Sequence, residues 1–524
     1  MTARVLVIAL DAASPVLLRR WGADGTLPNI GRLLREGLSG ASRSLEGFYH
    51  GSTWPSFMTG RSPGNHGVYW LFQAAPGEYE QSRLTASQIG RFPSLWDVAA
   101  AAGKRVAVLD VPFDRPHPGF SGVSCIEWYS HDPIFGFQTS PTGLAKEIER
   151  LEGPHPAPDY CDAVRRDAAS CRRFIDQLVK GAGLRSRIAR RVLGGSDWDL
   201  AIQVFAETHC AGHQLWHLHD PAHPGHDAAL AREAGDGIRE VYVAVDKAVG
   251  EIIEAVAGPE STVMLVDLHG MSYMAGAGSI VADFLERLGL VTRVPPPPPP
   301  GPLKTTLGPL WRAFPAGVRN AFAPLKRYVM GPPPPLEEPG VIRPQFIPGA
   351  SRCYWVNLGH SVSGIRLNIR GRERAGMLPP EEAESLVAML TEELLALRYE
   401  ADGGAVVESV RRGRDLYPGP EAEWLPDLVV DWDLSRPFGS AEVGTGEGGL
   451  LRVRSPRGGL IEKQNRNGRS GEHRNEGLFI ARGPGITPGT LVRTVSTMDY
   501  APTIAKMLGC EMEADGSVIA EISG

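Results

Sequence analysis

The stretch VLVIAL, residues 5–10, with Asp11 directly after it, decides the fold of this chain. Six consecutive apolar residues are typical of a strand that is covered on both faces, because a strand with one wet face alternates apolar and polar residues. Three more runs share this character: RVAVLDV (105–111), DLAIQVFA (199–206) and STVMLVDL (261–268). Together they predict a mostly parallel sheet.

Segments with helical spacing lie between these strands. They are LPNIGRLLREG (27–37), SLWDVAAAAGK (94–104) and the long segment 237–258. The later chain is predicted to add a strand at 363–373, a helix at 379–398, a strand at 477–486 and a helix at 496–509. This alternation predicts an α/β fold, with helices on both faces of a central, mostly parallel sheet.

The composition favours a globular protein and argues against binding to a nucleic-acid polymer or spanning a membrane. The 524 residues are 42% hydrophobic and 22% charged, which is enough for a large buried core. A net charge of -6 leaves no general excess of basic residues for a nucleic-acid polymer. No apolar run approaches the roughly 20 residues that span a bilayer. The six cysteines show no CxxC spacing, so we expect a reduced, cytoplasmic setting.

The regular alternation stops near residue 290. Two proline-rich runs occur here, VPPPPPPGP (294–302) and GPPPPLEEPG (331–340). Such runs are expected to form stiff, extended spacers. We therefore predict a Pro-rich insertion at 290–350, carried by one catalytic domain made of residues 1–289 and 351–524. The insertion could form a lid over the site, or it could be an ordinary surface excursion.

Polar side chains follow several of the predicted strands. The carboxyl ends of parallel strands meet at one edge of a sheet, and imidazoles and carboxylates there can bind a metal ion. Each group also has a simpler explanation, since an aspartate at a strand end often caps a helix and an HxxxH pair on a helix is a weak signal. The groups are Asp11, His209, His213, Asp267, His269 and His473.

Several motifs follow one another along the chain in a distinctive order. They are Asp11 after VLVIAL, STWPSFMTGRSPGNHG (52–67), the HxxxH region, HGM (269–271), GEHRNEGLFIARGPGI (471–486) and MDYAPTI (498–504). Their order resembles the alkaline phosphatase superfamily, specifically its type I phosphodiesterase and nucleotide pyrophosphatase branch. The resemblance extends from Asp11 to about residue 509 and excludes the Pro-rich insertion.

The resemblance implies two zinc-like ions at the edge of the sheet, with manganese as the alternative metal. Asp11, Thr53 and His269 match the ligands of one ion, and His213 and His473 match ligands of the other. Thr53, which precedes an aromatic residue and a proline, matches the family's nucleophile, whereas Ser52 does not. The implied reaction is attack by the Thr53 hydroxyl on phosphorus, followed by hydrolysis of the phosphothreonine.

Two positions depart from the family pattern. His209 stands where the family has an aspartate, and Leu268 stands where the family has an aspartate before the histidine of HGM. Asp267 lies one residue earlier, and adjacent strand residues point to opposite faces. We therefore expect one firm site of three imidazoles, from His209, His213 and His473, and a second site of doubtful occupancy.

The implied activity is that of a metal-dependent phosphoric ester hydrolase, of phosphodiesterase or pyrophosphatase type, acting on a small anionic phosphate ester. Arg366 and Arg370 could bind an anionic group of the substrate, or they could lie on a solvated strand face. Two other functions stay open. The same Thr53 could pass the phosphoryl group to an acceptor alcohol, or the chain could be a catalytically degenerate homologue that binds an anion or a partner.

Overall fold

The structure is a computed structural model that describes residues 4–117, 121–157, 163–195, 197–295 and 341–523. Its main feature is a nine-stranded sheet. In spatial order the strands are β21 (Gly489–Ser496), β2 (Leu38–Arg43), β20 (Glu476–Arg482), β9 (Ser261–Asp267), β1 (Arg4–Leu10), β8 (Leu200–Phe205), β5 (Val106–Leu109), β6 (Gly122–Ile126) and β7 (Gln138–Ser140).

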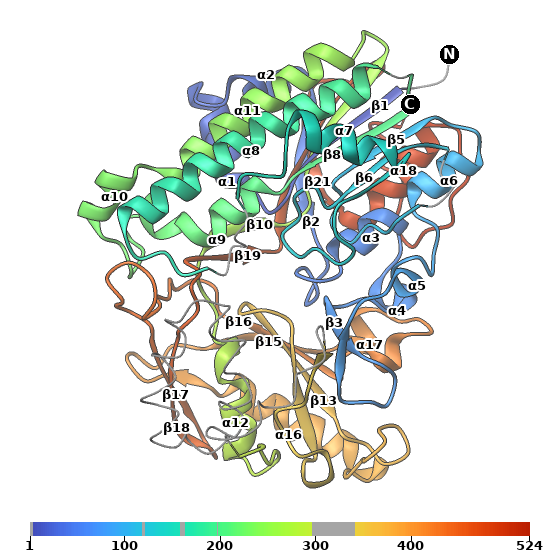
Figure 1. Cartoon of the computed structure of the whole chain (residues 1–524). Coiled ribbons are helices and arrows are strands. Elements are labelled where there is room, and N and C mark those ends of the chain that lie inside the picture. The colour runs from blue at the N-terminus through green and yellow to red at the C-terminus, as the bar shows by residue number, and fades with distance from the viewer. Residues whose placement is uncertain (1–3, 118–120, 158–162, 196, 296–340, 524) are drawn as a thin grey trace, which may run out of the picture.

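The pairing confirms the predicted, mostly parallel sheet. β1 pairs in parallel with β8 and β9, and β5 pairs in parallel with β8 and β6. β20 and the edge strand β7 run antiparallel to their neighbours. All four apolar runs are strands of this sheet, so their carboxyl ends lie side by side (Figure 1).

Helices cover both faces of the sheet, as predicted. Successive side chains of a strand point to opposite faces, so Leu6 and Ile8 enter one apolar cluster while Val5 and Val7 enter another. The first cluster includes side chains of α1 (Pro15–Asp24), α2 (Pro28–Glu36), α7 (Gly143–Leu151), α8 (Ala168–Gly194), α9 (Glu207–His219), α10 (Ala228–Ala234) and α11 (Gly237–Val256). The second includes side chains of α3 (Thr53–Thr59), α5 (Ala86–Ile89), α6 (Leu95–Ala101) and α18 (Tyr500–Met507).

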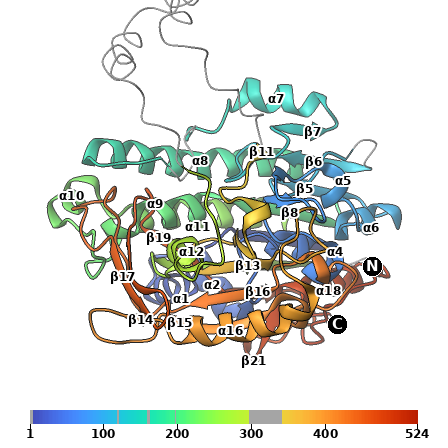
Figure 2. The same cartoon turned by 90° about the horizontal axis from the view of Figure 1, so that it is seen from below.

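A second lobe has its own apolar core. Its four-stranded antiparallel sheet has the order β12 (Cys353–Asn357), β13 (Val362–Leu367), β16 (Leu428–Trp432) and β15 (Val407–Arg412). The core joins this sheet to α12 (Val281–Arg287) and α16 (Ala383–Leu395) through Phe284, Ile365 and Leu390. Figure 1 shows this lobe below the large sheet, and Figure 2 shows β13, β16 and α12 in the middle of the molecule, with α9 on one side and α4 (Pro63–His66) on the other.

Short elements complete the described chain. They are β3 (Phe72–Ala74), β4 (Gln81–Arg83) and β11 (Val341–Ile342) in one small sheet, β14 (Arg398–Tyr399), β17 (Leu450–Ser455) and β18 (Gly459–Gln464) in another, and the helix α17 (Gly413–Leu416). The predicted strand at 363–373 ends at Leu367, and the predicted helix at 379–398 is α16, preceded by one 3-10 turn.

The two-stranded antiparallel sheet of β10 (Gly270–Tyr273) and β19 (Gly471–Arg474) brings the C-terminal motif to the strand edge. Met271 of β10 lies opposite His473 of β19. Since β10 follows β9 almost directly, this pairing places His473 beside the carboxyl end of the large sheet.

Residues 296–340, most of the predicted insertion at 290–350, lie outside the described residues. The insertion, its role as a lid and the domain limits at 289 and 351 therefore stay predictions. Within the described ranges, no helix combines the length and the apolar character needed to cross a membrane.

Candidate metal centre

A cavity of about 350 Å³ lies at the carboxyl ends of β1, β8 and β9. Its walls come from both lobes, because Asn357, Gly359 and His360 of the second lobe line it together with the ends of the large sheet. The titratable groups in its wall include Asp11, His50, His131, His209, His269, Glu472 and His473. Six segments that are far apart in the sequence thus supply one concentrated set of imidazoles and carboxylates.

Three of the predicted ligands form a tight cluster. His209 and His213 lie one turn apart on α9, and His473 reaches them from β19, with Nε2 of His213 and His473 3.1 Å apart. The ligand atoms of these three side chains all lie within 4.8 Å of one another. His213 Nδ1 donates a hydrogen bond to the carbonyl of Gly471 at 2.7 Å, which leaves its Nε2 lone pair for the centre.

The cluster suits a metal ion chemically. Burial is the largest cause that lowers the pKa of His209, His213 and His473 well below its usual range, and neighbouring imidazoles and Arg469 act in the same direction. Neutral imidazoles are the form that binds a metal. Nδ1 of His209 and Nδ1 of His473 are buried and have no hydrogen-bond partner among the described residues.

Asp11 and His269 stand next to this cluster. Trp54 Nε1 donates a hydrogen bond to Asp11 Oδ1 at 3.1 Å. Burial raises the pKa of Asp11 to about 7, although the hydrogen bond from Trp54 opposes the shift. Burial lowers the pKa of His269 to about 3, and its ring centroid is 4.8 Å from that of His473. A carboxylate and one more neutral imidazole therefore face the same cavity.

Asp267 takes a different place. Its Oδ1 accepts a hydrogen bond from the Ala13 backbone N–H at 3.1 Å, and the residue is not part of the cavity wall. Burial raises the pKa of Asp267 well above its ordinary value, and the nearby charge of Asp11 adds to the shift. The neighbouring Leu268 is buried in the apolar cluster on one face of the sheet. The structure thus brings Asp267 close to Asp11 without bringing it into the cavity.

Thr53 also lies outside the cavity wall. It is the first residue of α3, and its Oγ1 donates a hydrogen bond to the carbonyl of Tyr49 at 2.7 Å and contacts Ser44 Oγ. Ser52 Oγ donates a hydrogen bond to the carbonyl of Val68 at 2.5 Å. Both hydroxyls are buried and are held by backbone carbonyls, whereas the preceding His50 lines the cavity.

Sequence reasoning missed the pair of His50 and Glu472. His50 Nε2 and Glu472 Oε1 are 3.2 Å apart, and these side chains form a second possible metal-binding group with His473. Burial alone raises the pKa of Glu472, but the hydrogen bond and charge of His50, with the charges of His360 and Arg469, outweigh it and lower the pKa to about 2. His50 stands just before the quoted STWP motif, and only its position there signalled a role.

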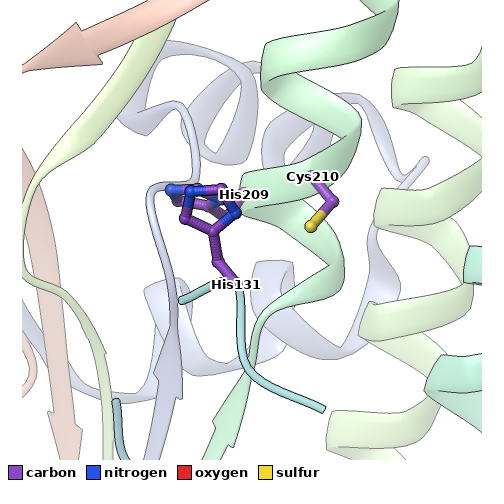
Figure 3. Close-up of side chains that lie close together, drawn as sticks. All are labelled: His131, His209 and Cys210. Atoms are coloured by element: carbon purple, nitrogen blue, oxygen red, sulfur yellow. The ribbon is translucent and has the colours of Figure 1, made fainter. Parts of the chain in front are cut away.

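His131 is a further residue that sequence reasoning missed. It approaches His209 from the loop after β6, and their ring centroids are 4.1 Å apart, while His209 and Cys210 project from α9 (Figure 3). His131, His209 and Cys210 form another group that could hold a metal, although Cys210 Sγ already accepts a hydrogen bond from the Tyr129 hydroxyl at 3.2 Å. The strand before it, β6, was not among the predicted runs, so no pattern in the sequence singled out His131.

The two arginines proposed for substrate binding differ in their surroundings. Arg366 is buried, pairs with Glu373 at 2.9 Å and donates to the carbonyls of Glu423 and Leu425, both at 3.0 Å. It lines a neighbouring cavity of about 390 Å³ that shares Trp70, Ile342, Asn357 and Gly359 with the metal-site cavity. Arg370 is exposed and lines neither cavity.

Comparison with known proteins agrees with this architecture. Residues 5–430 match the model of the family described as type I phosphodiesterase / nucleotide pyrophosphatase. No curated protein matches the chain.

Among solved structures, phosphonoacetate hydrolase from Sinorhizobium meliloti 1021 in complex with phosphonoacetate is 14% identical over 97% of this chain and 96% of that chain, with a TM-score of 0.53. Its complex with phosphonoformate has the same identity and coverage and a TM-score of 0.50. Human ectonucleotide pyrophosphatase / phosphodiesterase 5 is 11% identical over 99% of this chain and 98% of that chain, with a TM-score of 0.48. At these identities the first two likenesses indicate a shared fold.

Proposed function

The chain belongs to the type I phosphodiesterase / nucleotide pyrophosphatase family of phosphoric ester hydrolases, and from that premise we propose that it hydrolyses a small anionic phosphate ester in a metal-dependent reaction. The observation that carries this proposal is the cluster of His209, His213 and His473 at the carboxyl edge of the sheet. Three clustered, buried and neutral imidazoles, two of them with an unpartnered Nδ1, are unusual for a structural role. They are well suited to holding a divalent cation.

Zinc is the metal we propose, with manganese as the alternative. His209, His213 and His473 would hold one ion, and Asp11 and His269 would contribute to a second, whose affinity is lower because Leu268 stands where the family has an aspartate. Asp267 stays a candidate ligand of this second ion, since its Oδ2 is buried and has no hydrogen-bond partner among the described residues. A divalent ion at this position supplies positive charge for the phosphoryl oxygens and increases the acidity of a bound hydroxyl group or water.

The protein's own residues favour an anionic substrate. Arg469 lines the cavity beside His213, to whose Nε2 its guanidinium donates at 3.4 Å. A guanidinium binds phosphate oxygens through paired N–H groups. Residues of the second lobe close one side of the cavity, so part of the reacting group would be shielded from bulk water.

The organic part of the ester is proposed to occupy the neighbouring cavity. The two cavities share wall residues, and the second is lined by aromatic side chains. Such walls accept an apolar or aromatic substituent by stacking and area burial. These aromatic residues are Tyr69, Trp70, Tyr79, Phe346, Tyr354, Trp355 and Trp424.

The sequence-based assignment of Thr53 as the nucleophile stays a prediction. In the described conformation its hydroxyl donates to Tyr49, so attack by Thr53 would require this hydrogen bond to break and the side chain to rotate toward the cavity. Two features favour a second candidate function, the binding of a phosphate compound without turnover by a degenerate homologue. The Thr53 hydroxyl is engaged outside the cavity wall, and Leu268 stands where the family has an aspartate.

Turnover of bis(4-nitrophenyl) phosphate tests the proposal. The protein is stripped with a chelator, reloaded with zinc or manganese, and assayed beside a His213→Ala variant. We expect zinc- or manganese-dependent release of nitrophenol that the variant loses. Binding of inorganic phosphate without turnover under any metal would favour the degenerate homologue. A phosphorylated alcohol product in the presence of an acceptor would favour the transferase.

A further inference from the structure

His131 reaches the metal-site cavity from a loop with an internal anchor. The loop follows β6, and its residues 130–132 all lie in the cavity wall. Glu127 anchors the loop, because its carboxylate accepts hydrogen bonds from the backbone N–H groups of residues 134–136. The side chain of His131 is only 11% exposed. Contacts within the loop thus hold an imidazole at the cavity.

A buried arginine joins this loop to the start of α9. Arg185 of α8 donates a hydrogen bond from Nη2 to the carbonyl of Tyr129 at 3.2 Å, and another from Nε to Glu207 Oε1 at 3.0 Å. Glu207 is the first residue of α9, and His209 follows two residues later. The side chains of Arg185 and Glu207 are 1% and 0% exposed, and separating a buried ion pair leaves a charge without compensation. The pair therefore fixes His131 and His209 relative to each other.

The ring of His131 lies beside the three-histidine cluster, next to His209. The ring centroids of His131 and His209 are 4.1 Å apart (Figure 3), and those of His131 and His213 are 6.0 Å apart. His131 and His209 could instead hold an ion with Cys210, but a neutral imidazole has one lone pair, so His209 serves one ion only. Cys210 accepts a hydrogen bond through its sulfur and is not part of the cavity wall. The ion of the three-histidine cluster is therefore the one that His131 can join.

From this arrangement we propose that His131 is a fourth ligand of the ion held by His209, His213 and His473. The inference rests on the proposed metal-dependent hydrolysis. Asp132 supports the role, because its Oδ2 lies 3.5 Å from His131 Nε2, and carboxylates commonly orient the second ring nitrogen of a metal-bound histidine. Four neutral imidazoles leave the charge of a divalent ion uncompensated, which strengthens its attraction for a phosphoryl oxygen. Zinc can take a fifth ligand, so the fourth imidazole does not exclude the substrate.

Cobalt(II) in place of zinc shows which side chains touch the ion, because a cobalt–thiolate bond gives a charge-transfer absorption band in the near ultraviolet. The variants His131→Cys and Ser130→Cys introduce a thiol at neighbouring positions of the same loop, and the second is the matched control. Both are made in an Asp11→Asn background, so that one ion per chain is measured. His131→Gln in the same background removes the ligand with little change in side-chain size.

We expect the charge-transfer band in His131→Cys, and no band in the Asp11→Asn background or in Ser130→Cys. Competition with a chromophoric chelator measures zinc affinity, and thermal unfolding of each metal-free protein checks its fold. His131→Gln should bind zinc at least about 10-fold more weakly than the background, since even the hydrogen-bonded partners of metal ligands contribute about 10–100-fold. Ser130→Cys should keep the zinc affinity of the background.

A band in the background protein would assign Cys210 to the ion and overturn the inference. So would cobalt binding by His131→Cys without the band, or an unchanged zinc affinity in His131→Gln. Should His131→Cys not fold, the affinity of His131→Gln decides the question. In each of these cases zinc binding by the wild type leaves the proposed function intact. A wild type that binds no zinc or manganese would instead remove the proposed function, and this inference with it.

Discussion

Nε2 of His50 lies 3.2 Å from Oε1 of Glu472, although the two residues are 422 positions apart in the chain. Their side chains are only 5% and 2% exposed. A buried carboxylate needs a partner, and here the partner is an imidazole in the wall of the metal-site cavity. The segment before α3 and the two-stranded sheet β10–β19 meet at this contact.

Removal of the Glu472 charge should slow turnover without abolishing substrate binding. Glu472→Gln keeps the shape and the acceptor oxygen but removes the charge that orients His50, so we expect kcat to fall by about 10–100-fold with a smaller change in KM. Steady-state kinetics with 4-nitrophenyl phosphate measures this. Glu476→Gln is the matched control, because Glu476 is an exposed carboxylate in the same segment of the chain. Equal effects of the two variants would contradict the prediction.

Loss of one imidazole from the three-histidine cluster should remove a metal ion. We expect His213→Ala to lower bound zinc by about one ion per chain, because three ligands define the site. His217→Ala is the control, since His217 is also buried on α9, one turn further on, and its Nδ1 lies 3.1 Å from Ser470 Oγ. Elemental analysis of both proteins tests the difference. Retention of full zinc by the His213 variant would exclude the cluster as a metal site.

The two predicted metal sites should respond differently to pH. Asp11 has a pKa of about 7 because burial raises it, so below that pH an ion bound there must displace a proton. Its affinity should fall by about tenfold for each pH unit below 7. The imidazoles of the three-histidine cluster already have lowered pKa values, so their ion should persist.

Metal content after dialysis at about pH 8 and about pH 5.5 measures this contrast, with a decrease from about two ions to about one expected. Asp11→Asn should hold about one ion at both values, because its amide carries no titratable charge. In the metal-free protein the raised pKa of Asp11 also affects stability. The folded state keeps a proton on Asp11 that the unfolded state has lost, so the stability contribution of Asp11 should fall as pH rises from about 4 to about 7.

Substitution of Arg366 should lower the stability of the protein, whereas substitution of Arg370 should not, because Arg366 is buried and Arg370 is exposed. Arg366→Met leaves the buried Glu373 with Arg372 as its remaining partner, and we expect a loss of about 2 kcal/mol in unfolding free energy. Arg370→Met removes an exposed side chain and should change stability by less than about 0.5 kcal/mol. Urea unfolding of both variants measures the difference. A raised KM for Arg366→Met at unchanged stability would return Arg366 to the role of a substrate ligand.

Most of the fold was predictable because apolar periodicity is a local property. The continuous runs at 5–10 and 261–268 can be buried only in a covered sheet, and both are central strands. The second lobe was less predictable. Its strands contact residues such as Phe284, far from them in sequence, and no local pattern reveals that residues 351–465 build a separate core.

The candidate site was predictable where a polar residue follows a strand or stands on a helix. Asp11, His209, His213, His269 and His473 all reach one centre, since strand ends and one face of α9 fix their directions. The prediction for Asp267 depended on a kink after β9, and the chain does bend at residues 268–269. Asp267 lies outside the cavity wall, but its Oδ2 is buried without a hydrogen-bond partner among the described residues, so its role as a ligand stays a prediction.

The sequence by itself determined the α/β sheet, the order of the motifs and the imidazoles that gather at its edge, because these depend on patterns of neighbouring residues. Only the tertiary structure decided which side chain of the segment 50–54 faces the cavity. That choice depends on how α3 begins, on the Tyr49 carbonyl that holds the Thr53 hydroxyl, and on Glu472, which β19 brings to His50 from the other end of the chain. Such contacts are set by packing in three dimensions and leave no signature in a local stretch of sequence.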